Sequence, residues 1–456
     1  MILKKNNLFY LLIFVLIVGF FLRYINNYNQ MYWLDEAYTL FLSDPSIPFS
    51  ELSKKIYDID DNPSLYFYIL RYFNYLSYTP ENIRLSSIIF SVFSLVISIQ
   101  FYRNFLNKEE SFYAFLLLTF NIFLIWQSKE ARISNSVLFF SLLNFNIFFL
   151  YLKNNSKFYS FMLLSANIFL ISYYPFLITI LITQFFYIIL SFKKKYFDYF
   201  LITLATLILY FFLNYDYLIS NLSKTDHIGV FEYKFFINYF FRTFFGSIFF
   251  GGISLLIFVY SFLKIFFKEK KNDLIFFNIL LIIVTYSFII FYSYFKAGIM
   301  VPRYFIFLIP SIILVIVKIV YNYRLLRYFF LALTILNTLI LFDDFKIKKP
   351  KVSYLLNNID TNFTNNFFVN EGHLMDKYFI KSNLILKNLN YIKKNNLNNV
   401  DKFYYICLNH PEMHVGNNKN IQEIEKCNKN FYEFNKNFVI DIKDFKIILF
   451  EKKTQN

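Results

Sequence analysis

Glycine, cysteine and histidine are scarce in this chain of 456 residues, which contains eight glycines, two cysteines and four histidines. No Gly-rich phosphate-binding loop, dinucleotide fingerprint or nucleophile elbow occurs, and each of these motifs needs glycines at fixed positions. The two cysteines do not have a spacing typical of a metal site. The absence of a nucleotide-binding motif argues against an ATP-driven pump.

Charged residues are nearly absent from a series of hydrophobic segments that occupy most of the first 342 residues. The chain as a whole is 57% hydrophobic and 23% aromatic, which is more than a soluble domain needs for its core. Each segment is long enough, at roughly 20 residues, to cross a bilayer as a helix. We therefore predict an all-α polytopic membrane protein with about eleven transmembrane helices. The predicted spans are Asn7–Arg23, Arg84–Phe105, Ser111–Gln127, Ser134–Tyr151, Phe158–Tyr174, Phe176–Phe192, Phe197–Asn214, Gly246–Phe267, Leu274–Tyr294, Tyr304–Val320 and Leu326–Phe342.

The formal net charge of +16 is concentrated in the short loops between these segments and in the C-terminal tail. Basic loops beside spans follow the positive-inside rule and contact anionic lipid, so we expect membrane lipids rather than nucleic acid as partners. Lys4 and Lys5 then place the N-terminus in the cytoplasm, and an odd number of spans places the C-terminal region outside. The first segment is interpreted as an anchor because no small-x-small cleavage site follows it. The predicted location is a bacterial-type cytoplasmic (inner) membrane.

The first outer loop, residues 24–83, is too long to be a simple connection. Within it, Pro63–Tyr78 is aromatic on most faces but is interrupted by Arg71 and Asn74. This pattern is typical of a helix that lies in the membrane interface. A similar stretch, Phe235–Phe245, precedes the eighth span.

The composition changes at about Asp343 to polar sequence rich in Asn and Lys. Strand-like and helix-like runs occur in it, which predicts a small extracytoplasmic α/β domain over residues 343–456, after a transmembrane domain over residues 1–342. The strand-like runs are Phe403–Leu408, Phe438–Ile442 and Phe445–Phe450, and the helix-like runs are Val352–Ile359 and Asn420–Lys426. Cys407 and Cys427 lie in this region, and one disulfide or two free thiols are both compatible with the sequence.

An acidic pair, Asp35 and Glu36, follows the first span within the run Trp33–Thr39. Adjacent carboxylates point in different directions, so one can accept a proton from an attacking hydroxyl while the other orients it or holds a cation. Aromatic neighbours such as Tyr38 are typical of places where sugars stack. The alternative interpretation is a solvated acidic loop.

Two further charged motifs should face the same side of the membrane as this pair. Lys129, Glu130 and Arg132 lie between the third and fourth spans, and Arg303 begins the tenth, with Lys296 nearby. An arginine presents a planar fork of donors that suits phosphate oxygens. The alternatives are a salt-bridged turn for the first motif and contact with lipid headgroups for the second.

A cluster of acidic and polar residues, Asp58, Asp60, Asp61 and Asn62, precedes Pro63 in the first outer loop. Carboxylate and amide oxygens at such a position either bind a cation or cap the helix that follows. Helix capping is the default interpretation.

These motifs, in this order, resemble the GT-C superfamily of integral membrane glycosyltransferases, and above all the branch with the protein O-mannosyltransferases and the aminoarabinose transferase of lipid A. That branch has a first-loop Asp-Glu, a His-Pro-Pro-Leu-Tyr-like element, a Gln-Glu-Ala-Arg-like turn and an Arg-Tyr at a late span. The corresponding segments here are Leu34–Thr39, Asn62–Tyr66, Ser128–Arg132 and Arg303–Phe305. Asn62 and Ser64 stand where His and a second Pro are frequent, so a role for that His does not carry over. The likeness covers roughly Met1 to Val320.

The resemblance implies transfer of a sugar from a polyprenyl phosphate to an acceptor hydroxyl on a protein, lipid or surface glycan, at the outer face of the membrane and with inversion. Asp35 would be the general base, and Glu36 would support it or hold a divalent cation; no other cofactor is implied. The residues expected to stabilise the departing phosphate are Lys129, Arg132, Arg303 and Lys296, and those expected to support the substrate or a metal are Glu130, Asp61, Asn62, Tyr38 and Tyr304.

Two other functions are weighed against this one. A polysaccharide polymerase or ligase would have its large outer loop late in the chain, whereas the large loop here is the first. A lipid or oligosaccharide flippase would show internal repeats and ionisable residues within its spans. No repeat is found and the spans carry little charge, so a glycosyltransferase is the prediction, with its sugar and acceptor left open.

Overall fold

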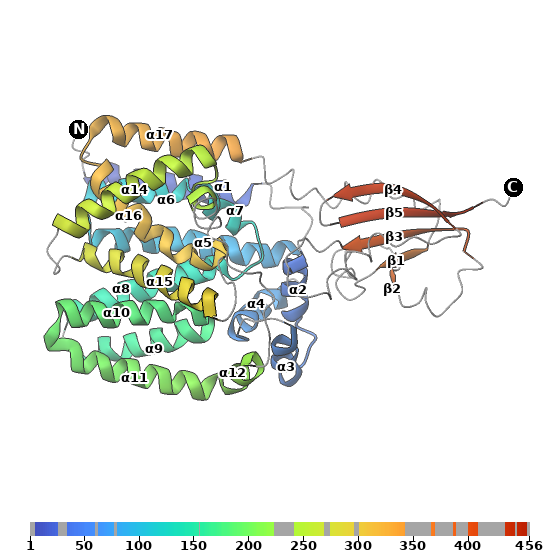
Figure 1. The fold of residues 1–456 in the computed structure, drawn as a ribbon, viewed down its shortest axis with the longest axis horizontal. Coiled ribbons are helices and arrows are strands. Elements are labelled where there is room, and N and C mark those ends of the chain that lie inside the picture. The colour runs from blue at the N-terminus through green and yellow to red at the C-terminus, as the bar shows by residue number, and fades with distance from the viewer. Residues whose placement is uncertain are drawn as a thin grey trace. The chain divides into compact units, whose positions relative to one another are not determined.

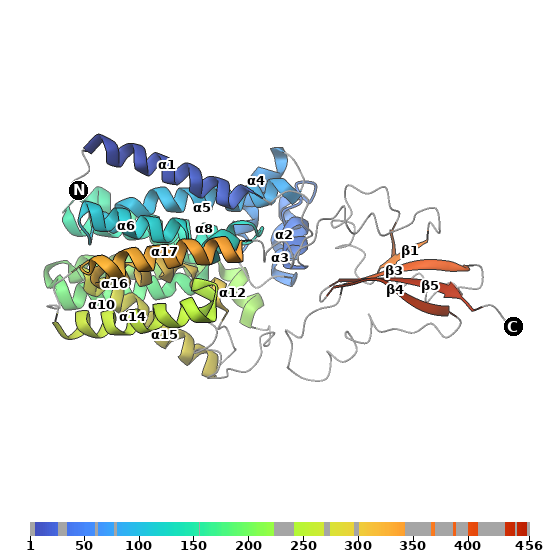
Figure 2. The ribbon, with the colours of Figure 1, turned by 90° about the horizontal axis from the view of Figure 1, so that it is seen from above.

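Two units make up the computed structural model of the chain. The first, which is helical, contains Met1–Asn27, Ser43–Thr225 and Phe231–Phe345, and the second, which holds a sheet, contains Tyr28–Leu42, Asp226–Val230 and Lys346–Asn456 (Figures 1 and 2). The structure describes residues 5–25, 34–59, 63–76, 80–154, 156–222, 241–268, 274–295, 301–342, 366–369, 386–388, 400–408, 434–442 and 445–453.

Helices occupy each of the predicted spans, which confirms the polytopic helical fold class. They are α1 (Lys5–Tyr24), α5 (Pro80–Arg103), α6 (Lys108–Thr119), α7 (Ile122–Ser128), α8 (Ser134–Lys153), α9 (Lys157–Tyr173), α10 (Ile178–Ser191), α11 (Tyr196–Leu213), α14 (Ile248–Lys268), α15 (Ile275–Phe295), α16 (Ile309–Val320) and α17 (Arg324–Leu341). Within the described part of the chain, seven helices are long and apolar enough to cross a membrane, and the pair α6–α7 is an eighth candidate. These properties define an integral membrane protein.

The third predicted span is broken, because α6 and α7 meet at an angle of 54°. Asn121 lies at the break and caps α7, since its side chain accepts a hydrogen bond from the Leu124 backbone N–H at 3.0 Å. The Asn121 amide also donates to the Phe244 carbonyl at 3.0 Å. Backbone groups that a bend exposes at membrane depth need such partners. The break therefore has a local cause in one asparagine.

A ladder of polar side chains joins α8, α9, α10 and α11, which lie side by side (Figure 1). The Asn144 amide donates to the Asn167 carbonyl oxygen at 2.8 Å, and the Gln184 amide donates to that of Asn144 at 2.7 Å. The Tyr199 hydroxyl donates to Gln184 at 2.6 Å. All four residues are buried. Interhelical hydrogen bonds of this kind hold spans together where apolar packing alone gives little preference.

Short helices lie at one end of the helical unit rather than along it (Figure 1). They are α3 (Phe49–Ile59), α4 (Leu65–Leu76) and α12 (Tyr215–Leu222). At about 18 Å, α4 is too short to cross a bilayer. Its buried face includes Arg71 and Asn74, whereas Tyr72 and Tyr75 are exposed. The position of α4 in the membrane interface stays a prediction. Most of the similar stretch Phe235–Phe245 lies outside the described residues.

The second unit contains helix α2 (Leu34–Leu42) and a five-stranded sheet with the order β2-β1-β3-β5-β4. The strands are β1 (Phe367–Val369), β2 (Leu386–Asn388), β3 (Lys402–Leu408), β4 (Phe434–Ile442) and β5 (Phe445–Lys452). β1 runs parallel to β2 and β3, whereas β5 is antiparallel to β3 and β4. The three predicted strands coincide with β3, β4 and β5.

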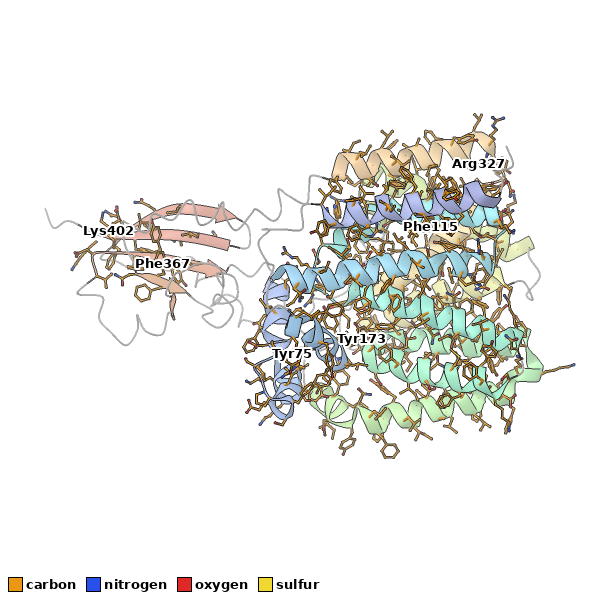
Figure 3. The ribbon with its side chains drawn as sticks, turned by 180° about the vertical axis from the view of Figure 1, so that it is seen from behind. Tyr75, Phe115, Tyr173, Arg327, Phe367 and Lys402 are labelled. Carbon is orange, nitrogen blue, oxygen red and sulfur yellow. The ribbon has the colours of Figure 1, made fainter. Side chains whose placement is uncertain are left out.

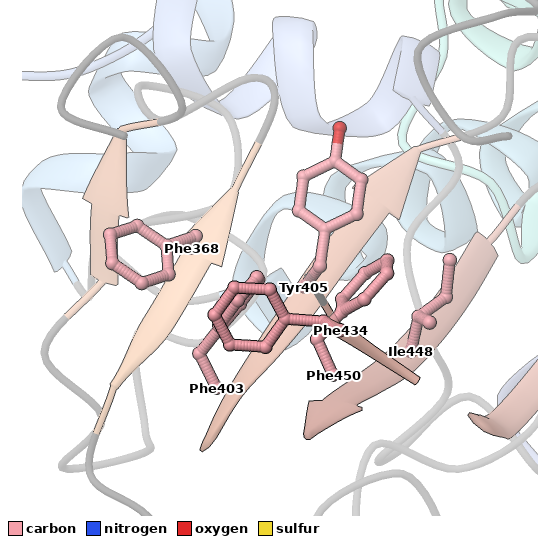
Figure 4. Close-up of a cluster of buried hydrophobic side chains, with 6 residues drawn as sticks. All are labelled: Phe368, Phe403, Tyr405, Phe434, Ile448 and Phe450. Atoms are coloured by element: carbon pink, nitrogen blue, oxygen red, sulfur yellow. The ribbon is translucent and has the colours of Figure 1, made fainter. Parts of the chain in front are cut away.

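The core of the sheet is aromatic (Figure 4). Phe403 on β3 pairs with Phe450 on β5, and Tyr405 pairs with Ile448, so alternate residues of both strands share one face. Stacked rings 5.1 Å apart at Phe403 and Phe450 make the closest cross-strand pair in this face. The predicted helices Val352–Ile359 and Asn420–Lys426, Cys427 and the side chain of Cys407 lie outside what the structure describes, so the disulfide stays a prediction.

Candidate functional site

Two turns that begin with proline meet at the same end of the helical unit as α4. One is η1 (Pro175–Leu177), between α9 and α10, and the other is η3 (Pro302–Leu308), which leads into α16. Proline fixes φ and has no backbone N–H, so it ends one helix and starts the next. Each turn therefore presents the residues around its proline to the end of the bundle. Figure 3 shows Tyr75 and Tyr173 toward this end and Arg327 at the opposite end.

Aromatic residues from the two turns pack against each other and against Arg303. The Tyr304 ring lies 5.9 Å from Phe176, nearly parallel to it, and 6.0 Å from Tyr174. Tyr292 of α15 contacts Phe176 edge-on at 6.0 Å. The Arg303 guanidinium carbon lies 5.7 Å from the centre of the Tyr304 ring, within cation–π range. We call these five residues the Tyr174 cluster.

Arg132 and Arg303 both act on Tyr174. The Tyr174 side chain is buried, and its hydroxyl has no hydrogen-bond partner among the described residues. Burial raises the pKa of Tyr174 well above its usual value, Tyr304 and Tyr217 raise it further, and the Arg303 and Arg132 guanidinium groups oppose this rise. Both guanidinium groups therefore lie within electrostatic range of Tyr174, and Arg303 also contacts the Tyr304 ring of the same cluster.

The three charged residues of the turn that carries Arg132 differ in burial. Lys129 caps the end of α7 and is fully buried, with its ammonium 4.1 Å from the centre of the Phe342 ring. Glu130 and Arg132 are half-buried, and the Arg132 backbone N–H donates to the Glu130 carbonyl at 2.8 Å. Lys129 therefore contributes a buried positive charge in an aromatic contact, whereas the Arg132 side chain lies within electrostatic range of Tyr174.

Two buried amides flank this turn and were not predicted. Gln127 precedes it and Asn135 follows it, at the start of α8. The Gln127 side-chain oxygen and both polar atoms of Asn135 have no hydrogen-bond partner among the described residues. Leaving a buried polar group unpaired costs about 1–3 kcal/mol. Unpaired polar atoms therefore lie on both sides of the turn that carries Arg132.

The predicted motif Asn62–Tyr66 approaches the same turn through α4. The Tyr66 ring contacts the Tyr173 ring at 6.1 Å, and the Tyr173 hydroxyl donates to the Ser136 hydroxyl at 2.5 Å. Ser136 lies in the first turn of α8, four residues after Arg132. Asp61, Asn62 and Lys296 lie outside the described residues, and their roles stay predictions.

The acidic pair begins helix α2. Glu36 is buried, with 1% of its side chain exposed, and Tyr38 is half-buried. The side chain of Asp35 lies outside what the structure describes. Among the described residues, no group of three or more His, Cys, Asp or Glu side chains could hold a metal ion. The assignments of Asp35 and Glu36 to catalysis therefore stay predictions.

Arg71 and Asn74 bind the segment that follows α2, which sequence reasoning did not anticipate. Arg71 donates to the Ile47 carbonyl at 2.5 Å and to the Pro45 carbonyl at 2.8 Å. Asn74 donates to the backbone and side-chain oxygens of Ser43, each at 2.9 Å. The two polar residues that interrupt the aromatic face of α4 thus fix the chain directly after the acidic helix.

No family model matches the chain, and no curated protein matches its sequence. The fold is similar to that of solved GT-C membrane proteins, as the resemblance of the motifs implied. The structure is similar to that of ArnT from Cupriavidus metallidurans bound to undecaprenyl phosphate, with a TM-score of 0.59 and 9% identity over 98% of each chain. For ArnT in the apo state the TM-score is 0.55, with 9% identity over 97% of each chain. An oligosaccharyltransferase from Archaeoglobus fulgidus, tethered with an acceptor peptide, has a TM-score of 0.49, with 11% identity over 82% of this chain and 63% of the other.

Proposed function

We propose that this protein transfers a sugar from a polyprenyl-phosphate donor to an acceptor hydroxyl. The proposal is supported by Arg303, which lies over the Tyr304 ring, and by Arg132, which lies within electrostatic range of Tyr174. Both belong to a fold that is similar, over nearly its whole length, to an ArnT structure that holds undecaprenyl phosphate. Two arginines beside unpaired buried polar groups suit the phosphate of such a donor.

The arginines would stabilise the charge that develops on the leaving phosphate. Arg132 and Arg303 each offer a planar fork of N–H donors for phosphate oxygens, and preorganised donors favour the transition state over the ground state. Lys129 would add a buried positive charge to the same turn. Lys296 is assigned to the phosphate by its position before η3, and Tyr304 would orient Arg303 through its ring contact.

Asp35 would act as the general base, and Glu36 would orient it or hold a divalent cation. The acceptor hydroxyl gives its proton to the Asp35 carboxylate while its oxygen forms a bond to the anomeric carbon of the sugar. The bond from that carbon to the phosphate oxygen breaks, and the electron pair leaves with the polyprenyl phosphate. Attack opposite the leaving group inverts the anomeric centre. A phosphate leaves near neutral pH without a proton, so one base suffices.

The hydrocarbon chain of the donor has a suitable place between α10 and α11. An apolar groove of about 350 Å³ lies there and begins at Ile178, the first residue after η1. Phe185, Phe186 and Phe200 form part of its walls. A prenyl chain in this groove would extend along the helices from a phosphate held at the Tyr174 cluster. Burial of each CH₂ group there would contribute about 0.8 kcal/mol.

The acceptor and the orientation complete the proposal. The acceptor is a hydroxyl of a protein, lipid or surface glycan, with Glu130, Asp61, Asn62 and Tyr38 as supporting residues. Transfer takes place on the extracytoplasmic side of a bacterial-type cytoplasmic membrane, because the loops at the opposite end of the helices are basic. The apolar helices described above supply the membrane anchor.

The test is transfer from a panel of labelled polyprenyl-phosphate sugars in membranes that contain wild type or Asp35→Asn. We expect the wild type to transfer label from one donor, and the variant to lose at least 100-fold in rate, since a general base contributes about 10²–10⁴-fold. Asp216→Asn is the matched control, because Asp216 is an exposed carboxylate on the short helix α12 of the helical unit.

Equal rates in wild type and Asp35→Asn would remove Asp35 from the chemistry. If no donor supports transfer by the wild type while labelled lipid moves between leaflets, the protein is a flippase and the proposal fails. Label found in long polymer chains would instead identify a polysaccharide polymerase.

A further inference from the structure

A second pocket lies at the end of the helical unit that is far from the Tyr174 cluster. It has a volume of about 970 Å³ and is formed by the ends of α8, α9, α10 and α11. Lys157, which begins α9, lines this pocket, whereas Tyr174 follows the last residue of the same helix. A helix of 17 residues is about 25 Å long. The pocket is therefore separate from the proposed donor site.

Positive charge dominates the lining of this pocket. Lys157, Lys194 and Lys195 line it, against the single acidic residue Asp198. Lys195 has a structural role, since its ammonium donates to the carbonyls of Tyr151, Leu152 and Asn154 at 2.6, 3.0 and 3.3 Å, at the C-terminal end of α8. Lys157 and Lys194 are exposed. Their charges can therefore act on a ligand in the pocket.

Hydrogen-bond donors for an anion are present in the same pocket. Tyr151 lines it and is buried, with 3% of its side chain exposed, and its hydroxyl has no hydrogen-bond partner among the described residues. The N-termini of two long helices also form its wall, at Ser156 and Lys157 of α9 and at Lys195, the N-cap residue of α11. Helix N-termini carry partial positive charge and unpaired N–H groups, both of which favour an anion.

Exposed aromatic side chains surround the pocket on the outer faces of α9 and α11. Phe158, Phe161 and Phe197 have 62%, 67% and 67% of their side chains exposed. The apolar residues Leu190 and Leu201 belong to the lining itself. A ligand held here would thus contact charge at one end and apolar surface at the other, at the level where a span ends and headgroups begin.

We propose that this pocket binds the phosphate headgroup of an anionic phospholipid, whose acyl chains lie along the exposed aromatic faces of α9 and α11. The two free lysines and the Tyr151 hydroxyl contact the phosphate. Basic pockets between spans bind anionic headgroups in this way, and the Lys- and Arg-rich end of a membrane protein faces the leaflet that holds such lipids. The site is independent of sugar transfer.

The test is the unfolding temperature of the purified full-length protein in a neutral detergent with added lipid. We expect phosphatidylglycerol to raise the unfolding temperature of the wild type, and phosphatidylcholine to leave it nearly unchanged. The double variant Lys157→Gln/Lys194→Gln should bind phosphatidylglycerol about tenfold or more weakly, given about 1 kcal/mol for each basic residue near an anionic surface. Tyr151→Phe should weaken binding as well, because it removes the buried donor.

The control is Lys264→Gln/Lys318→Gln, which removes two lysines that do not line the pocket. Because Lys157 and Lys194 are exposed, the test variant should unfold at the wild-type temperature without lipid. An unchanged response of the test variant to phosphatidylglycerol would overturn the proposal. So would an equal response to phosphatidylcholine, which would mean apolar contact alone, or an equal response to inorganic phosphate, which would mean a site for the free anion.

Discussion

At the residue scale, Arg132 and Arg303 are the predicted site residues that the structure relates to a buried tyrosine. Both were assigned to a phosphate from residue type and side of the membrane, and the structure places both near Tyr174. Tyr174 itself was not predicted. The chain contains 66 Phe and 39 Tyr, so a single aromatic residue carries little information until packing shows which ones are buried beside a charge.

Replacement of Arg303 should show whether its positive charge or the planar shape of its guanidinium group matters more for binding the donor phosphate. We expect Arg303→Ala to raise the KM for the lipid-phosphate donor by about 10–100-fold, because a hydrogen bond to a charged group contributes roughly 1.5–3 kcal/mol. Arg303→Lys keeps the charge but loses the planar fork, so it should recover only part of the loss. Initial rates at several donor concentrations measure this effect.

Arg324→Ala is the control for this series, since Arg324 is an exposed arginine at the start of α17. Donor KM values that are equal in wild type and Arg303→Ala would remove Arg303 from the phosphate site.

At the element scale, the sequence predicted the spans well because length and apolarity determine them. It did not predict the polar ladder of Asn144, Asn167, Gln184 and Tyr199, since which faces of the spans meet depends on packing. Nor did it predict the break between α6 and α7, which depends on one asparagine and its contact with Phe244. The sequence showed that Arg71 and Asn74 interrupt an aromatic helix. It did not show that they donate hydrogen bonds to the segment that follows α2.

The ladder predicts a stability effect. Gln184→Leu removes the bonds to Asn144 and Tyr199 and leaves both of their polar groups without this partner. We expect the free energy of unfolding in detergent to fall by about 1–3 kcal/mol, from two interhelical hydrogen bonds of about 0.6–1.7 kcal/mol each. Thr183→Val is the control, because the Thr183 hydroxyl bonds to the Thr179 carbonyl within its own helix. A Gln184 variant as stable as the control would mean that the ladder contributes nothing.

At the scale of the whole molecule, the basic ends of the helices gather together. The Tyr113 hydroxyl of α6 donates to the Arg327 carbonyl of α17 at 2.8 Å, and Lys153 of α8 donates to Asn104, directly after α5, at 3.0 Å. The positive-inside rule assigned the loops at these helix ends to the same side of the membrane. The hydrogen bonds show that these helix ends are close together in the fold. In the sheet, β1 and β2 have three residues each. An alternating pattern of apolar residues cannot be recognised over so few positions, so these two strands were not predicted.

The gathering of basic ends predicts an orientation that reporter fusions can measure. A fluorescent protein joined after Lys194 should fold and fluoresce, because that loop is cytoplasmic by the positive-inside rule. Alkaline phosphatase joined after Lys453 should be active if the C-terminal region is extracytoplasmic, as we propose. Phosphatase activity after Lys194 would reverse the orientation and place the arginines on the cytoplasmic side.

The two proline-led turns have a consequence for how such a site can change. Pro175 and Pro302 fix where their helices begin, the rings of Phe176 and Tyr304 project from those fixed points, and Tyr292 of α15 packs against Phe176. Exchanging a ring there alters the wall of the site without altering the backbone that carries the arginines. Under the proposed function, libraries restricted to these three positions are therefore a rational starting point for changing which sugar is accepted.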